Sequence, residues 1–179
     1  MNSYLRSWLA LAFVSTVLCA LVHVAVQQNY RMNLNDPQIQ MAEDAATSLG
    51  SGATVKTVVP ATTIDISKSL APWIAVYDDT GKVLASSARL NGVMPAVPAG
   101  VFDSVRQNGE DRVSWESASG VRNAIVVTLF SGKASGFVVA GRNMREVESR
   151  EDQLMHMVVG AWIVLLAGAA IILAIPLKK

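Results

Sequence analysis

Cysteine and histidine are scarce in this sequence, which limits the chemistry it can carry. The 179 residues include one cysteine, Cys19, and two histidines, His23 and His156. A single cysteine excludes an intramolecular disulfide and a multi-cysteine metal site. Residues 27–155 contain neither residue type, so that stretch lacks Ser-His and Cys-His nucleophiles and ordinary zinc sites. We therefore expect no enzymatic activity, no metal site and no cofactor.

Charged residues are also few, and the two signs nearly balance. They make up 16% of the sequence, against about 25% in a typical soluble domain. With 15 basic and 14 acidic residues, the chain has no basic field that could hold a nucleic-acid backbone. The shortage of charge predicts a membrane protein, and nucleic acid is excluded as a partner.

Two uncharged segments near the ends of the chain are long enough to cross a bilayer. They run from Ser7 to Val26 and from Met157 to Leu177. At about 1.5 Å per residue, each reaches roughly 30 Å, the thickness of the hydrocarbon core. We interpret residues 7–26 and 157–177 as transmembrane helices in contact with membrane lipid. In the first of them we expect Cys19 to be an inert thiol and His23 to be a helix-packing or near-interface histidine.

Basic residues flank the two spans in a way that predicts their orientation. Arg6 precedes the first span, and Lys178 and Lys179 follow the second, so both ends of the chain are expected in the cytoplasm. Residues 1–6 and 178–179 then form short cytoplasmic ends. Residues 27–156 form one extracytoplasmic domain, which is large enough to have its own core.

This domain is predicted to begin with helices. The first span is expected to continue outward through residues 27–34 and to bend near Pro37. The segment Asn35-Asp36-Pro37 is typical of a helix start, and Gly50 is expected to end that helix. Two short helices are expected at Asp65–Leu70 and Val101–Asn108.

The domain is also predicted to end with a helix. Asn143 and Glu146 form a capping pattern, and no glycine or proline follows before Gly160. One continuous helix is therefore expected to connect the last strand to the second span.

Five segments between these helices have the composition of strands. Trp73–Tyr77 and Lys82–Arg89, joined by turn residues, are predicted to form an antiparallel hairpin. Three more strands are expected at Asp111–Ser117, at Val121–Phe130, and from Gly136 to Gly141 or Arg142. The predicted fold class is α+β, a five-stranded antiparallel sheet with its helices gathered on one side.

Aromatic and arginine side chains on this sheet make up the candidate binding site. Alternation along the first strand places Trp73 and Tyr77 on one face. Because arginine can hold a carboxylate with two parallel hydrogen bonds, a pocket of aromatics and arginines would suit a small carboxylate ligand. The candidate ligand-binding residues are Trp73, Tyr77, Arg89, Trp115, Arg122 and Arg142. The sequence leaves open the alternative that the aromatics pack in the core and the arginines face water.

Parts of the sequence resemble a known group of sensor domains. The hairpin WIAVYDDTGKVLASSARLNG, the exit segment VVAGRNMREVESRE and the run NDPQIQMAEDAA are similar to extracytoplasmic PAS-like domains. Such domains, often called PDC or Cache domains, occur in bacterial sensor histidine kinases, chemoreceptors and cyclases. The resemblance covers residues 27–152. It implies strand order 2-1-5-4-3, a pocket for a small ligand and association through the N-terminal helix.

These observations predict a two-pass protein of a bacterial inner membrane, with a PAS-like sensor domain in the periplasm or outside the cell. Because only two residues follow the second span, we expect any signal to pass to a separate membrane signalling partner. The alternative is a non-sensing structural or accessory subunit of a membrane complex. Gly160 and Gly168 share a face of the second span, which predicts either a homodimer or close packing against the first span.

Overall fold

The computed structural model describes residues 3–175, without the side chains of residues 31 and 33–35. The chain divides into two compact units. The helix pair takes in the described parts of Met1–Arg31 and Val147–Lys179, and the sheet domain is Met32–Glu146. The predicted end of the second span at Leu177 and the basic flank at Lys178 and Lys179 lie outside the described residues.

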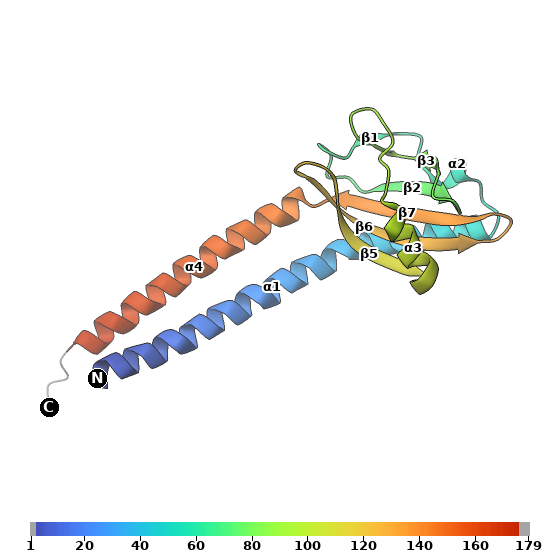
Figure 1. Ribbon diagram of the computed structural model, residues 1–179. Coiled ribbons are helices and arrows are strands. Elements are labelled where there is room, and N and C mark those ends of the chain that lie inside the picture. The colour runs from blue at the N-terminus through green and yellow to red at the C-terminus, as the bar shows by residue number, and fades with distance from the viewer. Residues whose placement is uncertain (1–2, 176–179) are drawn as a thin grey trace. The chain divides into compact units, whose positions relative to one another are not determined.

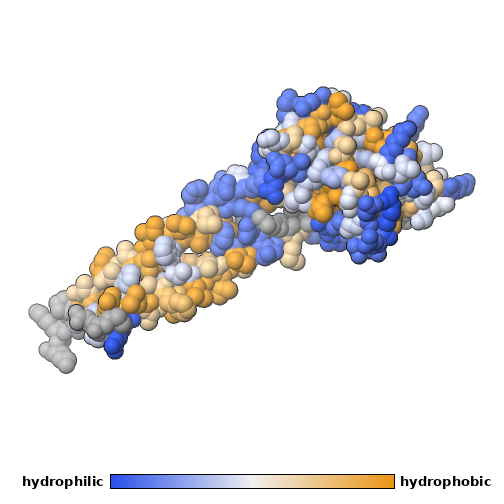
Figure 2. Space-filling model, in the orientation of Figure 1, coloured by the Kyte–Doolittle hydropathy of each residue, from blue (hydrophilic) through white to orange (hydrophobic). Residues whose placement is uncertain are grey.

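Two long helices, α1 (Ser3–Gly50) and α4 (Arg145–Ala174), supply the helix pair. The segments Ser3–Tyr30 and Arg145–Ala174 are long and apolar enough to cross a membrane. Large apolar side chains on both point outward, and Figure 2 shows hydrophobic residues over much of this surface. Exposed apolar surface is unfavourable in water by about 25 cal/mol per Å². Two such helices therefore indicate a membrane protein.

Polar contacts join the two helices of the pair, and they show that the helices run antiparallel. The contacts are Trp8 Nε1 to the Leu166 carbonyl (3.3 Å), Trp162 Nε1 to Thr16 Oγ1 (2.9 Å), and Gln27 Nε2 to Glu151 Oε2 (3.5 Å). A Cβ added at Gly160 or Gly168 would meet no atom within 4 Å. The predicted close packing of these two glycines against the first span is therefore wrong, and the homodimer stays a prediction.

A five-stranded antiparallel sheet lies at the centre of the sheet domain (Figure 1). Its strands are β2 (Trp73–Asp78), β3 (Val83–Ser86), β5 (Glu110–Ala118), β6 (Val121–Ser131) and β7 (Ser135–Asn143). They follow the order β3-β2-β7-β6-β5, which is the order 2-1-5-4-3 implied by the resemblance. The predicted α+β class with a five-stranded antiparallel sheet is confirmed.

Strands β2, β6 and β7 are buried on both faces of the sheet, and different helices cover the two faces. On the α3 face, Trp73 and Tyr77 pack with Phe102 and Val105 of α3 (Ala99–Asn108). On the α1 face, Ile74 and its neighbours pack against the C-terminal part of α1 and the segment that follows α2 (Val55–Val58). The prediction that the helices gather on one side is wrong. The reason is that β2, β6 and β7 contain continuous apolar runs, which are typical of strands buried on both faces.

The predicted short helix at Asp65–Leu70 is also wrong. Ile64–Asp65 forms a short strand, β1, which pairs in parallel with β4 (Ala88–Arg89). After β1 the chain turns, because the Asp65 carboxylate accepts hydrogen bonds from the backbone and the hydroxyl of Ser67. Such local bonds compete with helix formation.

The predicted strand at Lys82–Arg89 is interrupted and becomes β3 and β4. Ser87 causes the interruption. Its hydroxyl bonds both the backbone N–H (3.0 Å) and the carbonyl (3.1 Å) of Ile74, so a side chain replaces part of the regular ladder with β2.

A new helix start at Asn35 is wrong too, because α1 is continuous and Pro37 lies inside it. An interior proline removes one helix hydrogen bond. Beyond it, Ala42, Ala45 and Leu49 bury the helix against the sheet, which offsets that loss. The predicted ends at Gly50 and before Gly109, and the continuous exit helix α4, are confirmed.

Candidate functional site

Three of the predicted ligand-binding residues are aromatic, and the structure brings them together on the α3 face. The rings of Trp73 and Trp115 meet edge to face with centroids 6.5 Å apart, and Tyr77 belongs to the same cluster. Trp73 and Tyr77 are only 1% and 2% exposed. Trp73 donates to Asn123 Oδ1 (3.3 Å), and the Tyr77 hydroxyl donates to the Pro95 carbonyl (3.1 Å). Both side chains are therefore fully engaged by the protein itself.

Burial also changes the acidity of the Tyr77 phenol. It raises the pKa of Tyr77 to about 12, because the charged phenolate would lose its hydration there. The neutral phenol is thus the form that the core holds.

The three predicted arginines lie elsewhere. Alternation along β6 and β7 places Arg122 and Arg142 on the α1 face, opposite Trp73. Arg122 is exposed, and Arg142 Nε donates to the Leu70 carbonyl (3.0 Å). Arg89 lies on β4, outside the five-stranded sheet. The six residues therefore do not surround one space, and their role in ligand binding stays a prediction.

Arg89 is the predicted residue that does line a cavity. Its Nη1 donates to the carbonyls of Ser86 (2.7 Å) and Ala88 (2.8 Å). The cavity, of about 410 Å³, lies beside α2 and β3. Its lining residues are Lys56, Val59, Pro60, Ala61, Thr63, Leu84, Ala85, Ser86, Arg89 and Met94. We call it the Arg89 groove.

The charge of the Arg89 groove distinguishes it from two cavities of similar size on the sheet domain. Those cavities, of about 400 and 470 Å³, include the carboxylates of Asp44 and Glu43 respectively. The Arg89 groove instead has two cations, Lys56 and Arg89, with hydroxyls and apolar side chains. An anion with a small apolar body matches this lining.

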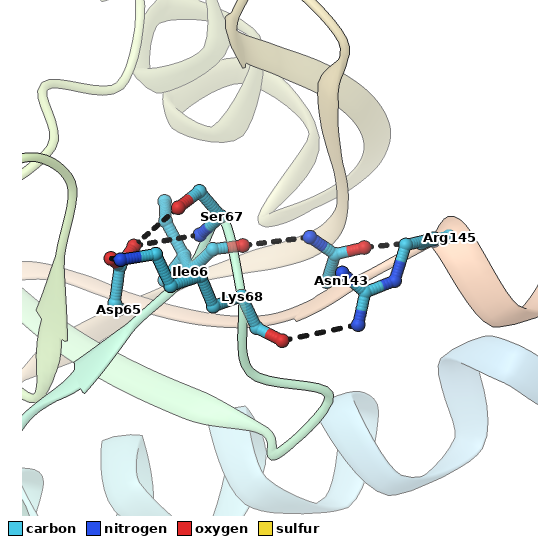
Figure 3. A network of polar contacts seen from close by, with 6 residues as sticks. All are labelled: Asp65, Ile66, Ser67, Lys68, Asn143 and Arg145. Carbon is cyan, nitrogen blue, oxygen red and sulfur yellow. Dashed lines mark hydrogen bonds and ion pairs between the residues drawn. The ribbon is translucent and has the colours of Figure 1, made fainter.

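A second polar site lies where β7 ends and α4 begins. Three side chains from this junction donate hydrogen bonds to alternate carbonyls of the segment after β1. Asn143 Nδ2 bonds the Ile66 carbonyl (2.7 Å), Arg145 Nη2 bonds the Lys68 carbonyl (3.1 Å), and Arg142 Nε bonds the Leu70 carbonyl (3.0 Å). Figure 3 shows the Asn143 and Arg145 parts of this network. The segment from Ile66 to Leu70 is therefore attached to the start of the exit helix.

Asn143 has two functions in this network. Its Oδ1 accepts the backbone N–H of Arg145 (2.8 Å), which caps α4 as the sequence predicts. Its Nδ2 donates to Ile66, and the side chain is 5% exposed. Because one amide group bonds a donor on one side and an acceptor on the other, its orientation is fixed by its neighbours. Release of either partner would leave a buried polar group unpaired.

The turn after β1 is stabilised by its own polar contacts. Hydrogen bonds from the Ser67 hydroxyl (2.7 Å) and backbone N–H (3.0 Å) lower the pKa of Asp65, and Lys68 Nζ lies 3.5 Å from its other oxygen. The carboxylate is therefore charged at neutral pH and keeps the turn closed.

The groove and the junction are connected through β1. The backbone N–H of Ile66 donates to the Arg89 carbonyl (2.9 Å), and the carbonyl of Ile66 accepts from Asn143. The capping pattern in the sequence predicts the cap at Asn143 but not the bond from Asn143 to Ile66. The two residues are 77 positions apart, and no local pattern predicts such a contact. The approach of Lys56 to Arg89 likewise gives no signal in the sequence.

No family model matches the chain, and no curated protein matches it.

Proposed function

We propose that this is a two-pass membrane protein whose PAS-like sheet domain binds a small carboxylate in the Arg89 groove and relays binding through α4 to a separate membrane partner. The observation that carries the proposal is the chain of hydrogen bonds from Arg89 through Ile66 and Asn143 to Arg145. It connects a cationic groove directly to the first turn of the helix that continues into the second span.

The order of the five strands and the two candidate spans support the sensor interpretation. Basic Arg6 before the first span supports cytoplasmic termini in a bacterial inner membrane, with the domain in the periplasm. A cysteine introduced at exposed Asn91 should then react with an impermeant thiol reagent in intact cells. Labelling only after permeabilisation would contradict this orientation.

Ligand binding is tested on the full chain in detergent micelles. We would measure the melting temperature with a panel of small mono- and dicarboxylates, including acetate, lactate, succinate and citrate. A compound that binds the native state raises the melting temperature by mass action. At 100 times its dissociation constant, the stabilisation is about 2.7 kcal/mol.

Variants locate the binding site. Lys56→Gln and Arg89→Gln should each abolish the ligand-dependent rise, because both remove a cation from the groove. Arg112→Gln is the matched control, since Arg112 is half-exposed on β5 and pairs with Glu110. The ligand-dependent rise is compared, rather than the melting temperature itself, because Arg89 also bonds the backbone. No rise with any carboxylate, or an undiminished rise in both groove variants, would refute the binding proposal.

The relay is tested by hydrogen exchange with the same ligand bound. Protection should increase at the amides of Ile66 and Arg145, which belong to the connecting chain. An alanine inserted after Ser149 should rotate the following helix by about 100° and abolish the response of a signalling partner. Binding with no change at these amides would refute the relay.

A second candidate function is a structural or accessory subunit that uses the fold without a ligand. The burial of Trp73 and Tyr77 at 1% and 2% exposure favours it, because the face predicted to hold a ligand is filled by the protein's own side chains. This candidate predicts that the carboxylate panel has no effect and that the alanine insertion leaves partner association unchanged.

A further inference from the structure

The helix pair contains a cavity of about 270 Å³ between α1 and α4. Thr16, Cys19, Ala20 and His23 line it from α1, and Met155, Val158, Val159 and Trp162 line it from α4. The hydrogen bond from Trp162 to Thr16 holds the two helices together beside it. The Thr16 hydroxyl and the Trp162 N–H are hydrogen-bonded to each other, and the rest of the lining is apolar apart from a thiol, an imidazole and a thioether.

These three groups are the features of the cavity that can bind a ligand atom. Cys19 is a free thiol, and it lies one helical turn before His23, so the two side chains share a face of α1. Met155 lines the cavity from the other helix and is 45% exposed. Across the described residues, His23 Nδ1 is the side-chain nitrogen or oxygen that is buried without a hydrogen-bond partner. An unpaired ring nitrogen is unfavourable in apolar surroundings, and its lone pair is available to a metal.

We propose that this cavity binds one Cu(I) ion through Cys19 Sγ, His23 Nδ1 and Met155 Sδ. Thiolate and thioether ligands select Cu(I), whereas calcium and magnesium require oxygen ligands. Zinc prefers sets of cysteine, histidine and carboxylate, and no group of three such residues gathers within residues 3–175.

Charge balance also favours this ion. A thiol loses its proton when it coordinates a metal, so one thiolate and one Cu(I) form a neutral complex. A neutral complex is compatible with the apolar interior that the spans would occupy, whereas a divalent ion with the same ligands would leave a net positive charge there. The sequence signal for this site is the spacing Cys-x-x-x-His from Cys19 to His23.

The test uses the full chain in detergent, titrated anaerobically with Cu(I) in competition with the chelator bicinchoninate. We expect one equivalent to bind. Cys19→Ser and His23→Gln should weaken binding by roughly 100-fold or more, and Met155→Leu by about 10-fold, because loss of a ligand is at least as severe as loss of a residue that orients one. X-ray absorption should show sulfur and nitrogen around the bound copper.

Matched controls come from the same region of α4. His156→Gln and Met157→Leu change an exposed histidine and a methionine that is 65% exposed, neither of which lines the cavity. Both should bind Cu(I) as the parent chain does. Met155→Leu nearly conserves volume, so its weaker binding would not reflect misfolding, and circular dichroism checks the helix content of every variant.

Several results would overturn the proposal. They are the absence of one-to-one binding, equal binding by Cys19→Ser or His23→Gln, and an equal loss of affinity in the two controls. Tighter binding of Zn(II) than of Cu(I) would also overturn it, because the thioether would then have no part in selecting the metal.

Discussion

Replacement of Asn143 by alanine should destabilise the sheet domain. It should also break the connection between Ile66 and the start of α4, because Asn143 bonds both. Alanine loses the cap of α4, which contributes about 1 kcal/mol. It also leaves the buried carbonyl of Ile66 without its donor at 2.7 Å, and an unsatisfied buried acceptor is unfavourable by about 1–3 kcal/mol. The sum is about 2–4 kcal/mol. For a domain of this size, it corresponds to a fall in melting temperature of roughly 8–16 °C.

A second substitution separates the two effects. In Asn143→Asp, one carboxylate oxygen can still accept the backbone N–H of Arg145 (2.8 Å in the parent), and a negative charge is favourable at a helix N-terminus. The other oxygen faces the carbonyl of Ile66 and repels it. We therefore expect Asn143→Asp to retain amide protection in the first turn of α4 and to lose it at Ile66. Asn143→Ala should lose protection at both places.

The assay is native-state hydrogen exchange and thermal unfolding of the full chain in detergent. Asn108→Ala is the matched control, because Asn108 is exposed at the end of α3 and makes one long side-chain hydrogen bond (3.3 Å). It should change stability by no more than about 0.5 kcal/mol. A loss below about 0.5 kcal/mol in Asn143→Ala, or the same exchange pattern in the alanine and aspartate variants, would refute the reasoning.

Three further predictions follow from close packing and burial. Gly141→Ala should lower the free energy of unfolding by about 3 kcal/mol or more, since its Cβ would clash with Trp73 Cζ2. In thermal unfolding, the double variant with Trp73→Phe should recover part of this loss, and no recovery would contradict the contact. Burial raises the pKa of Tyr77 to about 12 from its usual value of 10.0. The stabilisation by the neutral phenol is therefore complete below pH 10 and is lost as the pH rises through 12, which lowers the free energy of unfolding by about 2.7 kcal/mol. Tyr77→Phe should remove that part of the alkaline loss, and equal pH profiles would argue against it. Gly168→Leu should reduce crosslinked homodimer in membranes if that open glycine face meets a second copy, whereas an unchanged yield would exclude this interface.

Local patterns predicted most of the elements correctly, because their signals are local. The glycines that end α1 and α3 and the capping Asn143 act within a few residues. The order of the strands came from the resemblance, and the structure confirms it. Two of the errors arose where side-chain hydrogen bonds to the backbone interrupt regular structure, as those of Ser87 to Ile74 and of Asp65 to Ser67 do. Secondary-structure propensity and hydrophobic periodicity contain no information on side-chain hydrogen bonds of this kind.

The candidate site was harder to predict, for a different physical reason. Whether two residues on different strands share a face depends on register, and a shift of one residue reverses the answer. Trp73 pairs with Gly141, so the next residue, Arg142, points to the opposite face. The sequence determines which residues alternate within β2 and within β7, but it does not determine the register between the two strands. The placement of Trp73 and Tyr77 on one face could therefore be predicted. The prediction that they share a pocket with Arg122 and Arg142 is not supported, because those arginines lie on the opposite face.

The packing of the sheet domain indicates which element could move if the Arg89 groove were occupied. Trp73 lies directly on Gly141, at distances that leave no space for a methyl group, and β7 pairs along its length with both β2 and β6. A shift of these strands would break many contacts together. The β1 segment is different, because it pairs only with the two residues of β4 and is attached to the exit helix by side-chain hydrogen bonds. Ile66 directly after β1 is 0% exposed and belongs to the core on the α3 face, so displacement of this segment would disturb packing there as well as its hydrogen bonds. A ligand on Arg89 would therefore act on α4 through Ile66 and Asn143, while the pairing of β2, β7 and β6 is kept.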